Sequence, residues 1–368
     1  MSVTGSSRSA LAARTLVSLV VVSLALACSD DSTSPNGSFL DGTSSNHQIG
    51  VVVNSLGKSL TLFQLGSPTT QQEIPLGASS SITPTGLAVR GHLASVPLGN
   101  TASVALVDLS TQTISRVFTF PNGNTTGSAF SDDNTLFMAN STTGVVGRAT
   151  VTQSADSIAD TDSVAAAPTA ITVSGNRVLV TSANLDENFL PIGNGIVTAI
   201  DASTMEVLGT ATMGGTNSTD AALGPDGMLY VVNTGDYVSD GSITIVNPAT
   251  MAVVETVSGM GVGPGAIYID ANGLAYISGF FTGTLVWNTS TKTFVRGTDN
   301  PVCAKVGDVC RGAFAASTNS AGDIYQVFFG SPSESLPPYV FVFKGSSYTL
   351  SDSIATGSGP SAINIKTY

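Results

Sequence analysis

Two histidines, His47 and His92, are the natural starting point for acid–base chemistry in this chain. A histidine supports catalysis when a nucleophile or a carboxylate lies within its reach, and neither residue has such a partner nearby in the sequence. The chain also lacks a G-x-S-x-G nucleophile motif and a phosphate-binding P-loop. The glycine run GMGVGPG, residues 259–265, lacks the spacing of a dinucleotide-binding turn. Sequence motifs therefore predict no catalytic residue.

Two of the three cysteines, Cys303 and Cys310, lie close together in one polar segment. A metal site would need further cysteine or histidine ligands nearby, and the spacing is not that of a C-x-x-C redox motif. In an exported chain, such a pair favours a disulfide. Closing so short a loop contributes about 2 to 3 kcal/mol in the chain-entropy estimate.

Export is predicted from the N-terminus. Arg8 and Arg14 precede the apolar stretch LVSLVVVSLALA, residues 16–27, in the order that is typical of a secretory signal peptide. A membrane-spanning helix is the alternative, but a span needs roughly 20 apolar residues. This stretch is shorter and ends close to Asp30 and Asp31.

The end of that stretch, Ala25-Leu26-Ala27-Cys28, resembles the lipobox of bacterial lipoproteins. The resemblance implies a lipoprotein signal peptide over residues 1–27, with Cys28 acylated and exposed as the mature N-terminus. More than one acyl chain is needed for stable anchoring, which a multiply acylated cysteine, palmitate included, provides. Ser29 beside it favours sorting to the outer membrane. Cleavage with release of the protein remains the alternative.

Residues 28–46, CSDDSTSPNGSFLDGTSSN, are polar and small, and we expect them to form a flexible tether. Without the signal peptide the chain has 11 basic and 25 acidic residues, a net charge of −14. So acidic a chain is a poor ligand for nucleic acids or for anionic lipid headgroups. The membrane is therefore expected as a partner only through the lipid anchor.

The rest of the chain, residues 47–368, carries a repeat that is clearest at residues 218–258. This segment contains four short runs of β-branched and aromatic residues, separated by Asx, Pro and Gly turns, as a strand meander requires. The unit recurs about every 41 to 50 residues, the period of propeller blades. Four turns share one Asx chemistry, through Asp108, Asp201, Asn247 and Asn288.

The segment Tyr230-Val231-Val232-Asn233 resembles the strand that gives YVTN-type β-propeller repeat proteins their name. The resemblance covers residues 217–287 well and extends more loosely over residues 47–368. Residues 141–164 depart from it because they lack the usual turn. It implies a propeller fold, and it carries over no catalytic residue, because no motif of the lactonase-like or quinoprotein relatives is matched.

Counting the blades predicts a closed, all-β, seven-bladed propeller. First strands are expected near residues 84, 126, 168, 218, 264, 312 and 360. The chain ends on a first strand and the repeat region begins on a second strand, so the C-terminal strand should complete the N-terminal blade and remove an exposed edge. We expect a monomer.

The long insertions, residues 182–195, 233–241, 300–312 and 329–339, fall in two loop classes that emerge on one face of a meander. Long loops in compact domains are often functional, so this face is predicted to bind a protein or glycan partner. Its candidate residues are Asp186, Glu187, Phe189, Asp236, Tyr237, Asp240, Phe281, Glu334 and Tyr339. Each of them has packing of the loops onto the blades as its alternative role.

Two functions follow from this sequence. The first is a lipid-anchored binding or scaffolding propeller of the bacterial cell envelope, without a cofactor, although Asp186 and Glu187 would suit weak calcium binding. The second is an envelope hydrolase or lyase, lactonase-like, that uses carboxylates facing the central channel. The second function requires titratable side chains from several blades to converge in the channel mouth.

Overall fold

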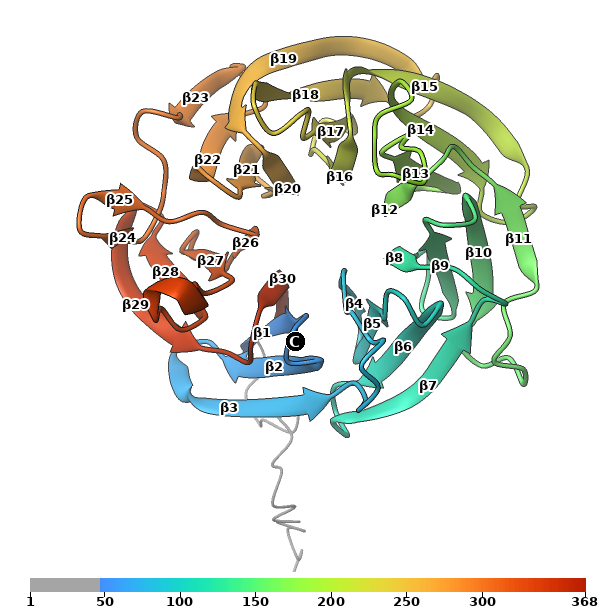
Figure 1. Ribbon diagram of the computed structural model, residues 1–368, viewed down its shortest axis with the longest axis horizontal. Coiled ribbons are helices and arrows are strands. Elements are labelled where there is room, and N and C mark those ends of the chain that lie inside the picture. Colours follow the sequence, from blue (N-terminus) through green and yellow to red (C-terminus); the bar gives the residue numbers. More distant parts are fainter. Residues whose placement is uncertain (1–46) are drawn as a thin grey trace, which may run out of the picture. The chain divides into compact units, whose positions relative to one another are not determined.

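The computed structural model describes residues 47–368, apart from the side chains of residues 67–70 and of Glu334. These residues form a ring of seven four-stranded antiparallel sheets around a central opening (Figure 1). The predicted seven-bladed propeller is therefore confirmed. The predicted signal peptide (residues 1–27), the tether (residues 28–46) and Cys28 lie outside the described residues.

The seven blades follow one another along the chain, and each contains four strands that run from the channel to the rim. From the innermost strand outward, the blades are β30 (Pro360–Thr367), β1 (Gln48–Asn54), β2 (Ser59–Gln64) and β3 (Ser67–Pro75); β4 (Ala88–Arg90), β5 (Leu93–Pro97), β6 (Ser103–Asp108) and β7 (Thr113–Thr119); β8 (Thr125–Phe130), β9 (Thr135–Asn140), β10 (Val145–Thr150) and β11 (Asp160–Ser163); β12 (Pro168–Ser174), β13 (Arg177–Ser182), β14 (Asn194–Asp201) and β15 (Val207–Thr216); β16 (Ser218–Leu223), β17 (Leu229–Asn233), β18 (Asp240–Asn247) and β19 (Ala252–Val262); β20 (Pro264–Ile269), β21 (Leu274–Gly279), β22 (Gly283–Asn288) and β23 (Thr293–Arg296); and β26 (Ala315–Thr318), β27 (Ile324–Phe328), β28 (Tyr339–Lys344) and β29 (Thr349–Ala355). The innermost strands begin close to the predicted positions, except that β4 and β26 begin a few residues later.

Two small elements lie outside the blades. Strands β24 (Lys305–Val306) and β25 (Val309–Cys310) form a hairpin in the connection between the sixth and seventh blades. A 3₁₀ helix, η1 (Pro332–Glu334), lies between β27 and β28. Within residues 47–368, no helix combines the length and the apolar character needed to cross a bilayer.

The C-terminal strand closes the ring, as the sequence predicts. Strand β30 pairs antiparallel with β1, from Gln48 opposite Thr367 to Val53 opposite Ala362. Beyond this strand, the ring of Tyr368 stacks on His47 and on His92, with centroids 5.8 and 5.9 Å apart. The Tyr368 hydroxyl also donates a hydrogen bond to the carbonyl oxygen of Gly91 (3.1 Å). Both histidines therefore contact the residue that ends the closing strand.

The hydrophobic core is divided among the seven junctions between neighbouring blades, with one buried cluster at each. Middle strands such as β17 are buried along their whole length, because both of their faces pack against adjacent sheets, whereas the outer strand β19 is largely exposed. Trp287 is fully buried at one junction, where its ring lies edge-on to Tyr230 of the preceding blade with centroids 6.1 Å apart. This tryptophan therefore packs between two blades.

The repeated Asx turns form as predicted between the third and fourth strands. In each, one side-chain oxygen of the Asp or Asn accepts hydrogen bonds from the backbone amides two and three residues later. The donor–acceptor distances are 2.8 and 3.2 Å at Asp108, 2.8 and 3.0 Å at Asp201, 2.9 and 3.3 Å at Asn247, and 2.9 Å twice at Asn288.

The asparagine that ends the YVTN-like strand has a structural role. Asn233 is buried, and its side-chain amide donates to the hydroxyls of Ser242 (3.1 Å) and Thr244 (2.9 Å) on the third strand. Its side-chain oxygen accepts a hydrogen bond from Ser218 of the first strand (2.7 Å). One residue thereby links three strands of a blade, and a buried amide stays satisfied.

The divergent segment at residues 141–164 still completes a blade, although its fourth strand, β11, is only four residues long. The preceding connection, residues 151–159, is held against the neighbouring blade in place of an Asx turn. Arg116 of β7 donates to the Asp156 carboxylate (2.7 Å) and to the Val151 carbonyl oxygen (3.0 Å). Ile158 is buried in the junction between the two blades.

Candidate binding face and central channel

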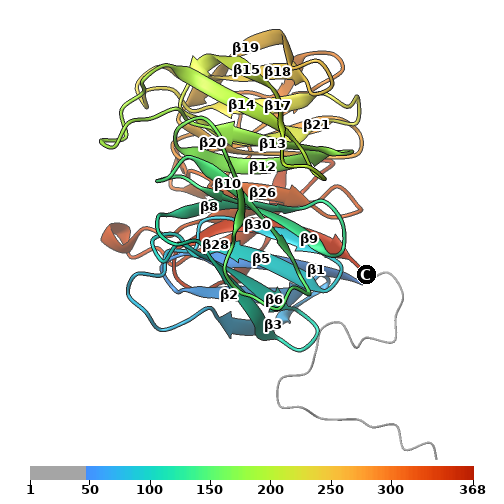
Figure 2. The same ribbon diagram turned by 90° about the vertical axis from the view of Figure 1, so that its right-hand side faces the viewer.

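The two faces of the ring differ in the loops they carry. Loops between second and third strands, and connections between blades, emerge on one face, which we call the long-loop face; it carries residues 76–87, 183–193, 234–239, 297–314 and 329–338. The opposite, tight-turn face carries the Asx turns and the end of β30. Figure 2 shows η1 and the C-terminus on opposite sides of the ring. All four insertions noted in the sequence contribute to the long-loop face.

The loop of residues 183–193 presents apolar side chains from a tip that is ordered by one carboxylate. Asp186 Oδ1 accepts hydrogen bonds from the amides of Asn188 (2.8 Å) and Leu190 (2.9 Å). Phe189 has a φ of 61°, and its side chain is 81% exposed. Asp186 therefore shapes the loop, and Phe189 is the residue that the loop presents.

The loop of residues 234–239 repeats this arrangement. Asp236 Oδ1 accepts hydrogen bonds from the amides of Ser239 (2.7 Å) and Val238 (3.0 Å), and these bonds hold the pKa of Asp236 below its ordinary value. Tyr237 has a φ of 60° and is 47% exposed. Again the acid orders the loop and an aromatic residue faces solvent.

The remaining predicted residues of the face are more dispersed. Glu187 is exposed beside Asp186, and Asp240 is exposed at the start of β18. Tyr339 is half-buried at the start of β28, with its ring against Phe341 (centroids 5.6 Å apart), so it packs on the sheet. Glu334 belongs to η1, but its side chain lies outside the described residues.

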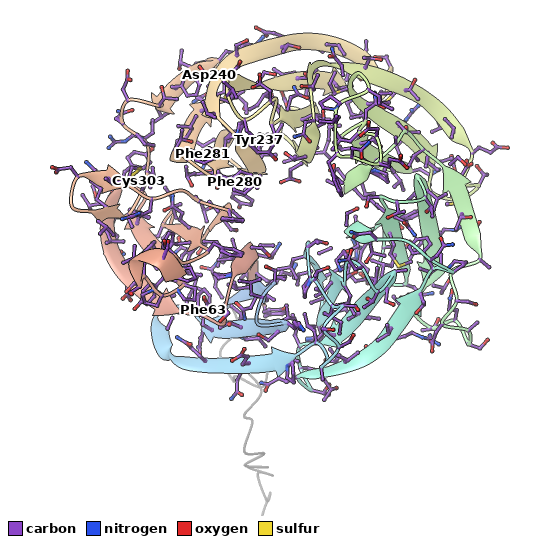
Figure 3. All side chains as sticks on the ribbon, viewed as in Figure 1. Phe63, Tyr237, Asp240, Phe280, Phe281 and Cys303 are labelled. Carbon is purple, nitrogen blue, oxygen red and sulfur yellow. A yellow bond between two sulfur atoms is a disulfide. The ribbon has the colours of Figure 1, made fainter. Side chains whose placement is uncertain are left out.

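A row of aromatic rings crosses the inner edge of the long-loop face. The ring centroids are 6.4 Å apart for Tyr237 and Phe280, 4.8 Å for Phe280 and Phe314 in an edge-to-face contact, and 4.7 Å for stacked Phe314 and Phe329. Phe281 is 63% exposed beside this row. Figure 3 labels Tyr237, Phe280 and Phe281 near the central opening.

The sequence prediction included Tyr237 and Phe281 but missed Phe280, Phe314 and Phe329. The available signal was their position: Phe280 and Phe329 directly follow second strands, and Phe314 directly precedes a first strand. These are the strand ends that open onto the long-loop face. The sequence did not indicate that the three rings contact one another.

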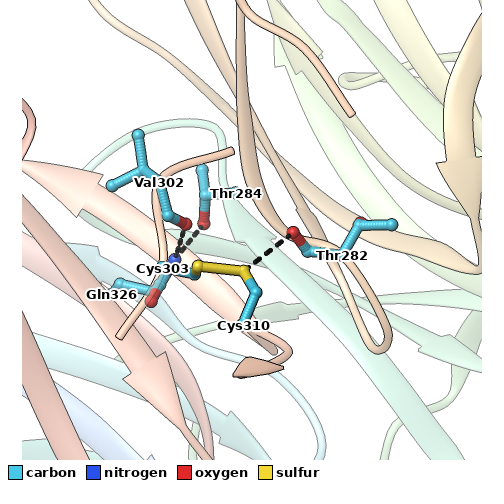
Figure 4. Close-up of a disulfide and its surroundings, with 6 residues drawn as sticks. All are labelled: Thr282, Thr284, Val302, Cys303, Cys310 and Gln326. Carbon is cyan, nitrogen blue, oxygen red and sulfur yellow. Dashed lines mark hydrogen bonds between the residues drawn. A yellow bond between two sulfur atoms is a disulfide. The ribbon is translucent and has the colours of Figure 1, made fainter. Parts of the chain in front are cut away.

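The predicted disulfide between Cys303 and Cys310 is present in the structure, with Cα atoms 5.6 Å apart (Figure 4). The buried side chain of Gln326 anchors the chain beside it by donating to the Val302 carbonyl oxygen (2.7 Å) and to the Thr284 hydroxyl (2.8 Å). The long connection is thus tied to the sixth and seventh blades.

The long-loop end of the central channel contains a cavity of about 450 Å³. Threonines at the start of successive inner strands join the blades around it. The hydroxyls of Thr126, Thr169 and Thr219 donate to the carbonyl oxygens of Pro168 (2.6 Å), Ser218 (3.0 Å) and Gly265 (3.0 Å) on the next blade. Phe280 and Phe314 also line this cavity.

Asp220 is the one carboxylate among the described residues that line this cavity. Its Oδ1 accepts a hydrogen bond from the Ala221 amide (2.9 Å), and its Oδ2 accepts one from the Ile267 amide of the next blade (2.9 Å). Burial raises the pKa of Asp220 to about 6, against the lowering effect of these two bonds. The converging carboxylates that a hydrolase or lyase would require are not found in the described lining.

A metal site would need several ligating side chains close together. Among residues 47–368, no group of three or more His, Cys, Asp or Glu side chains is arranged to hold a metal ion. One oxygen of Asp186 is already engaged by two backbone amides. Weak calcium binding at Asp186 and Glu187 stays a prediction.

Comparison with known proteins supports the fold. No family model matches the sequence, and no curated protein matches it significantly. Among solved structures, hydrazine synthase of Kuenenia stuttgartiensis superposes with a TM-score of 0.60 at 13% identity, over 79% of this chain and 97% of that chain. A functionally unknown protein from Desulfotomaculum acetoxidans gives a TM-score of 0.64 at 15% identity, over 88% and 99% of the two chains. The computationally designed Ika8 protein gives 0.57 at 13% identity, over 86% and 87%.

Identities this low establish a shared propeller fold and no shared activity. The similar structures include an enzyme, a designed protein and a protein of unknown function, which agrees with the use of one fold for many purposes. Membership of the YVTN-type repeat family and the lipobox at Cys28 remain predictions.

Proposed function

We propose that this protein is a binding propeller of the bacterial cell envelope, anchored by a lipid at Cys28, which captures a protein partner on its long-loop face. The observation that carries the proposal is a set of large apolar side chains exposed at the tips of second-to-third-strand loops. They are Leu56 (61% exposed), Phe189 (81%), Leu190 (61%), Ile192 (62%), Tyr237 (47%), Val238 (80%) and Phe281 (63%).

The composition of this set favours a protein as the partner. Leu56, Leu190, Ile192 and Val238 are aliphatic, and aliphatic side chains gain from burial against other apolar groups, whereas a glycan offers mainly hydroxyls. Aromatic and aliphatic anchors gathered on one face, surrounded by polar residues, are typical of protein interfaces. A glycan remains the alternative partner, through the exposed rings.

Backbone strain supports a binding role for two of the anchors. Phe189 and Tyr237 both have a φ near 60°, a left-handed conformation that costs a bulky residue on the order of 1 to 3 kcal/mol. Phe189 gains little burial that would offset this cost, since it is 81% exposed, whereas Tyr237 is about half exposed and its ring also contacts Phe280. Left-handed residues such as Gln112 and Met251 also occur in the tight turns, so this backbone conformation supports a binding role only together with the exposed aromatic side chains.

The point where the chain enters the propeller suits an anchored binding protein. His47 contacts Tyr368 on the tight-turn face, opposite the long loops. A tether of residues 28–46 ending at His47 would leave the long-loop face free for a partner. The proposed location is the outer membrane, on either side of it.

The test is a crosslinking pull-down from intact cell envelopes. The lipidated wild type is compared with a variant carrying Phe189→Ser, Tyr237→Ser and Phe281→Ser. A matched control carries Val207→Ser, Val254→Ser and Leu350→Ser, which removes three exposed apolar residues (46%, 57% and 51%) from outer strands. A Cys28→Ser form tests the anchor, since it should move the protein to the soluble fraction.

The proposal expects one defined protein to be lost from the loop variant and retained by the outer-strand control. A partner that disappears after glycosidase treatment of the envelope would identify a glycan instead. Equal recovery with both variants would refute binding through this face. Shortening residues 182–195 and 329–339 gives an independent version of the same comparison.

A further inference from the structure

The central channel contains a second, separate site that the loop tips do not share. Its cavity of about 450 Å³ lies at the long-loop end of the innermost strands, and its lining comes from every blade. This volume suits a small molecule and is too small for a folded partner. The chemistry of the cavity can therefore be considered apart from partner capture.

Asp220 is unusual because the other six blades show what the fold needs at its position. The residues that occupy the same place in each first strand, all lining the cavity, are Gly86, Gly127, Ala170, Ala266, Ala315 and Ala362. Six blades therefore have no side chain larger than a methyl group at this position, and their junctions still form. Blade packing does not require an aspartate at this position, although in the remaining blade Asp220 also accepts a hydrogen bond from the Ile267 amide of the next blade.

The Asp220 carboxylate has no cationic neighbour in the cavity. No Lys, Arg or His occurs among the described residues of the lining, and Tyr268 is the only other ionisable side chain there. Each oxygen accepts one backbone amide, from Ala221 and Ile267, which leaves further acceptor positions on both oxygens. Because removing a carboxylate from water is unfavourable unless it is paired, this group is suited to a positive ligand.

Aromatic rings complete the cavity. Phe280 and Phe314 line it together, in an edge-to-face contact with centroids 4.8 Å apart. Stacking of Phe329 on Phe314 supports this wall from behind, at 4.7 Å. The faces of such rings attract organic cations, and an aromatic wall beside one carboxylate is the usual means of binding them.

We propose that the long-loop end of the channel binds a small organic cation, with Asp220 as its counter-ion and Phe280 and Phe314 as its aromatic wall. A primary or quaternary amine fits this chemistry better than a metal ion. Calcium takes six to eight oxygen ligands, whereas the described lining offers one carboxylate and no group of three or more His, Cys, Asp or Glu side chains arranged to hold a metal ion.

The experiment compares two probes of the same shape, choline and its uncharged analogue 3,3-dimethylbutan-1-ol, by calorimetric titration of the full chain in a non-ionic detergent. We expect choline to bind about tenfold more tightly, since both the carboxylate and the rings act on its charge. Choline affinity should also fall below about pH 6, as Asp220 takes up a proton.

Three variants locate the site. Asp220→Ala introduces the residue that four other blades carry and should reduce choline affinity about three- to fivefold, toward the level of the alcohol, because the rings remain. Phe314→Leu should reduce it about three- to tenfold. Glu206→Ala removes an exposed acid outside the cavity lining and should leave the affinity unchanged.

Several results would overturn the proposal. They are equal binding of the two probes, no choline binding up to about 50 mM, or the same loss in the Asp220 and Glu206 variants. A choline affinity that stays constant between pH 5 and 7.5 would exclude Asp220 as the counter-ion. Because these measurements use no protein partner, failure here is distinguishable from failure of the loop tips to capture one.

Discussion

The long-loop and tight-turn faces are built on the same strands, yet they use similar residues for opposite purposes. On the tight-turn face, Asp108 caps a short turn that joins two strands of one blade, and Arg148 pairs with Asp160. On the long-loop face, Asp186 caps a tip that presents Phe189 to solvent. The comparison shows that capping of backbone amides by an aspartate stabilises the fold where the loop is short. Where the loop is long, the same capping holds an aromatic side chain out toward solvent.

The largest expected effect is on the closing strand, which ends on the tight-turn face. Deletion of residues 360–368 removes β30 and Tyr368 and exposes the edge of β1. We expect loss of cooperative unfolding in a thermal melt followed by circular dichroism. Replacing residues 183–193 by a short turn should shift the Tm by less than about 3 °C. Equal destabilisation by both changes would break the distinction between the faces.

The disulfide gives the next largest effect and refines the comparison, since it stabilises a loop of the long-loop face. Cys303→Ser with Cys310→Ser should cost about 2 to 3 kcal/mol, measured by urea unfolding under non-reducing conditions. Partner capture by Phe189 and Tyr237 should persist, because both lie in other loops. Loss of capture at full folding would show that the cystine loop belongs to the binding surface.

A matched pair of aspartates separates the two uses of Asx capping. Asp108→Ala should cost about 1 kcal/mol, or about 2 °C in Tm, and leave capture intact, because its turn joins the buried strand β6 to the outer strand β7 on the opposite face. Asp186→Ala should leave the Tm unchanged and weaken capture about tenfold, because Phe189 loses its fixed position. The reverse pattern in melts and pull-downs would contradict these roles.

The smallest effect is on the pH dependence of stability, where two carboxylates should act in opposite directions. Burial would raise the pKa of Asp108, but hydrogen bonds from Ser110 and Thr111 outweigh it and lower the pKa. The stabilisation that Asp108 gives the native state is therefore present at pH values above the pKa of this group in the unfolded chain. It is lost as the pH falls through the lower pKa of the group in the folded state.

For Asp220, burial raises the pKa from 3.8 to about 6, so the native state binds the proton more tightly than the unfolded state does. Stability from this group is fully present below pH 3.8 and declines as the pH rises to about 6. The Tm of the wild type relative to Asp220→Ala should therefore be higher at pH 5 than at pH 7.5. Asp108→Ala should show no change over this range, and equal behaviour of the two variants would contradict the assignment.

Much of the fold was predictable because its determinants are local. Alternating β-branched residues indicate the strands, and Asp201, Asn247 and Asn288 each bond to amides two and three residues later, within reach of a sequence pattern. The closing strand was predictable from counting, since the repeat begins on a second strand and ends on a first. The bond between Arg116 and Asp156 was not, because it joins two blades across 40 residues.

The candidate site was predicted less completely. Phe189, Tyr237 and Phe281 were identified from their loops, and the structure places them on the same face. Asp186 and Asp236 were predicted to contribute to the acidic binding face, but backbone amides occupy one oxygen of each. The sequence gives the residue type, while the partner of each carboxylate depends on the conformation of the loop.

By itself, the sequence determined the strand pattern, the turns, the number of blades and the choice of the face with long loops. These depend on interactions within one blade, where the residues are close along the chain. Only the tertiary structure decided that Asp220 faces the same cavity as Phe280 and Phe314. Closure of the ring brings these side chains together from separate blades, and burial then gives one ordinary-looking aspartate a raised pKa.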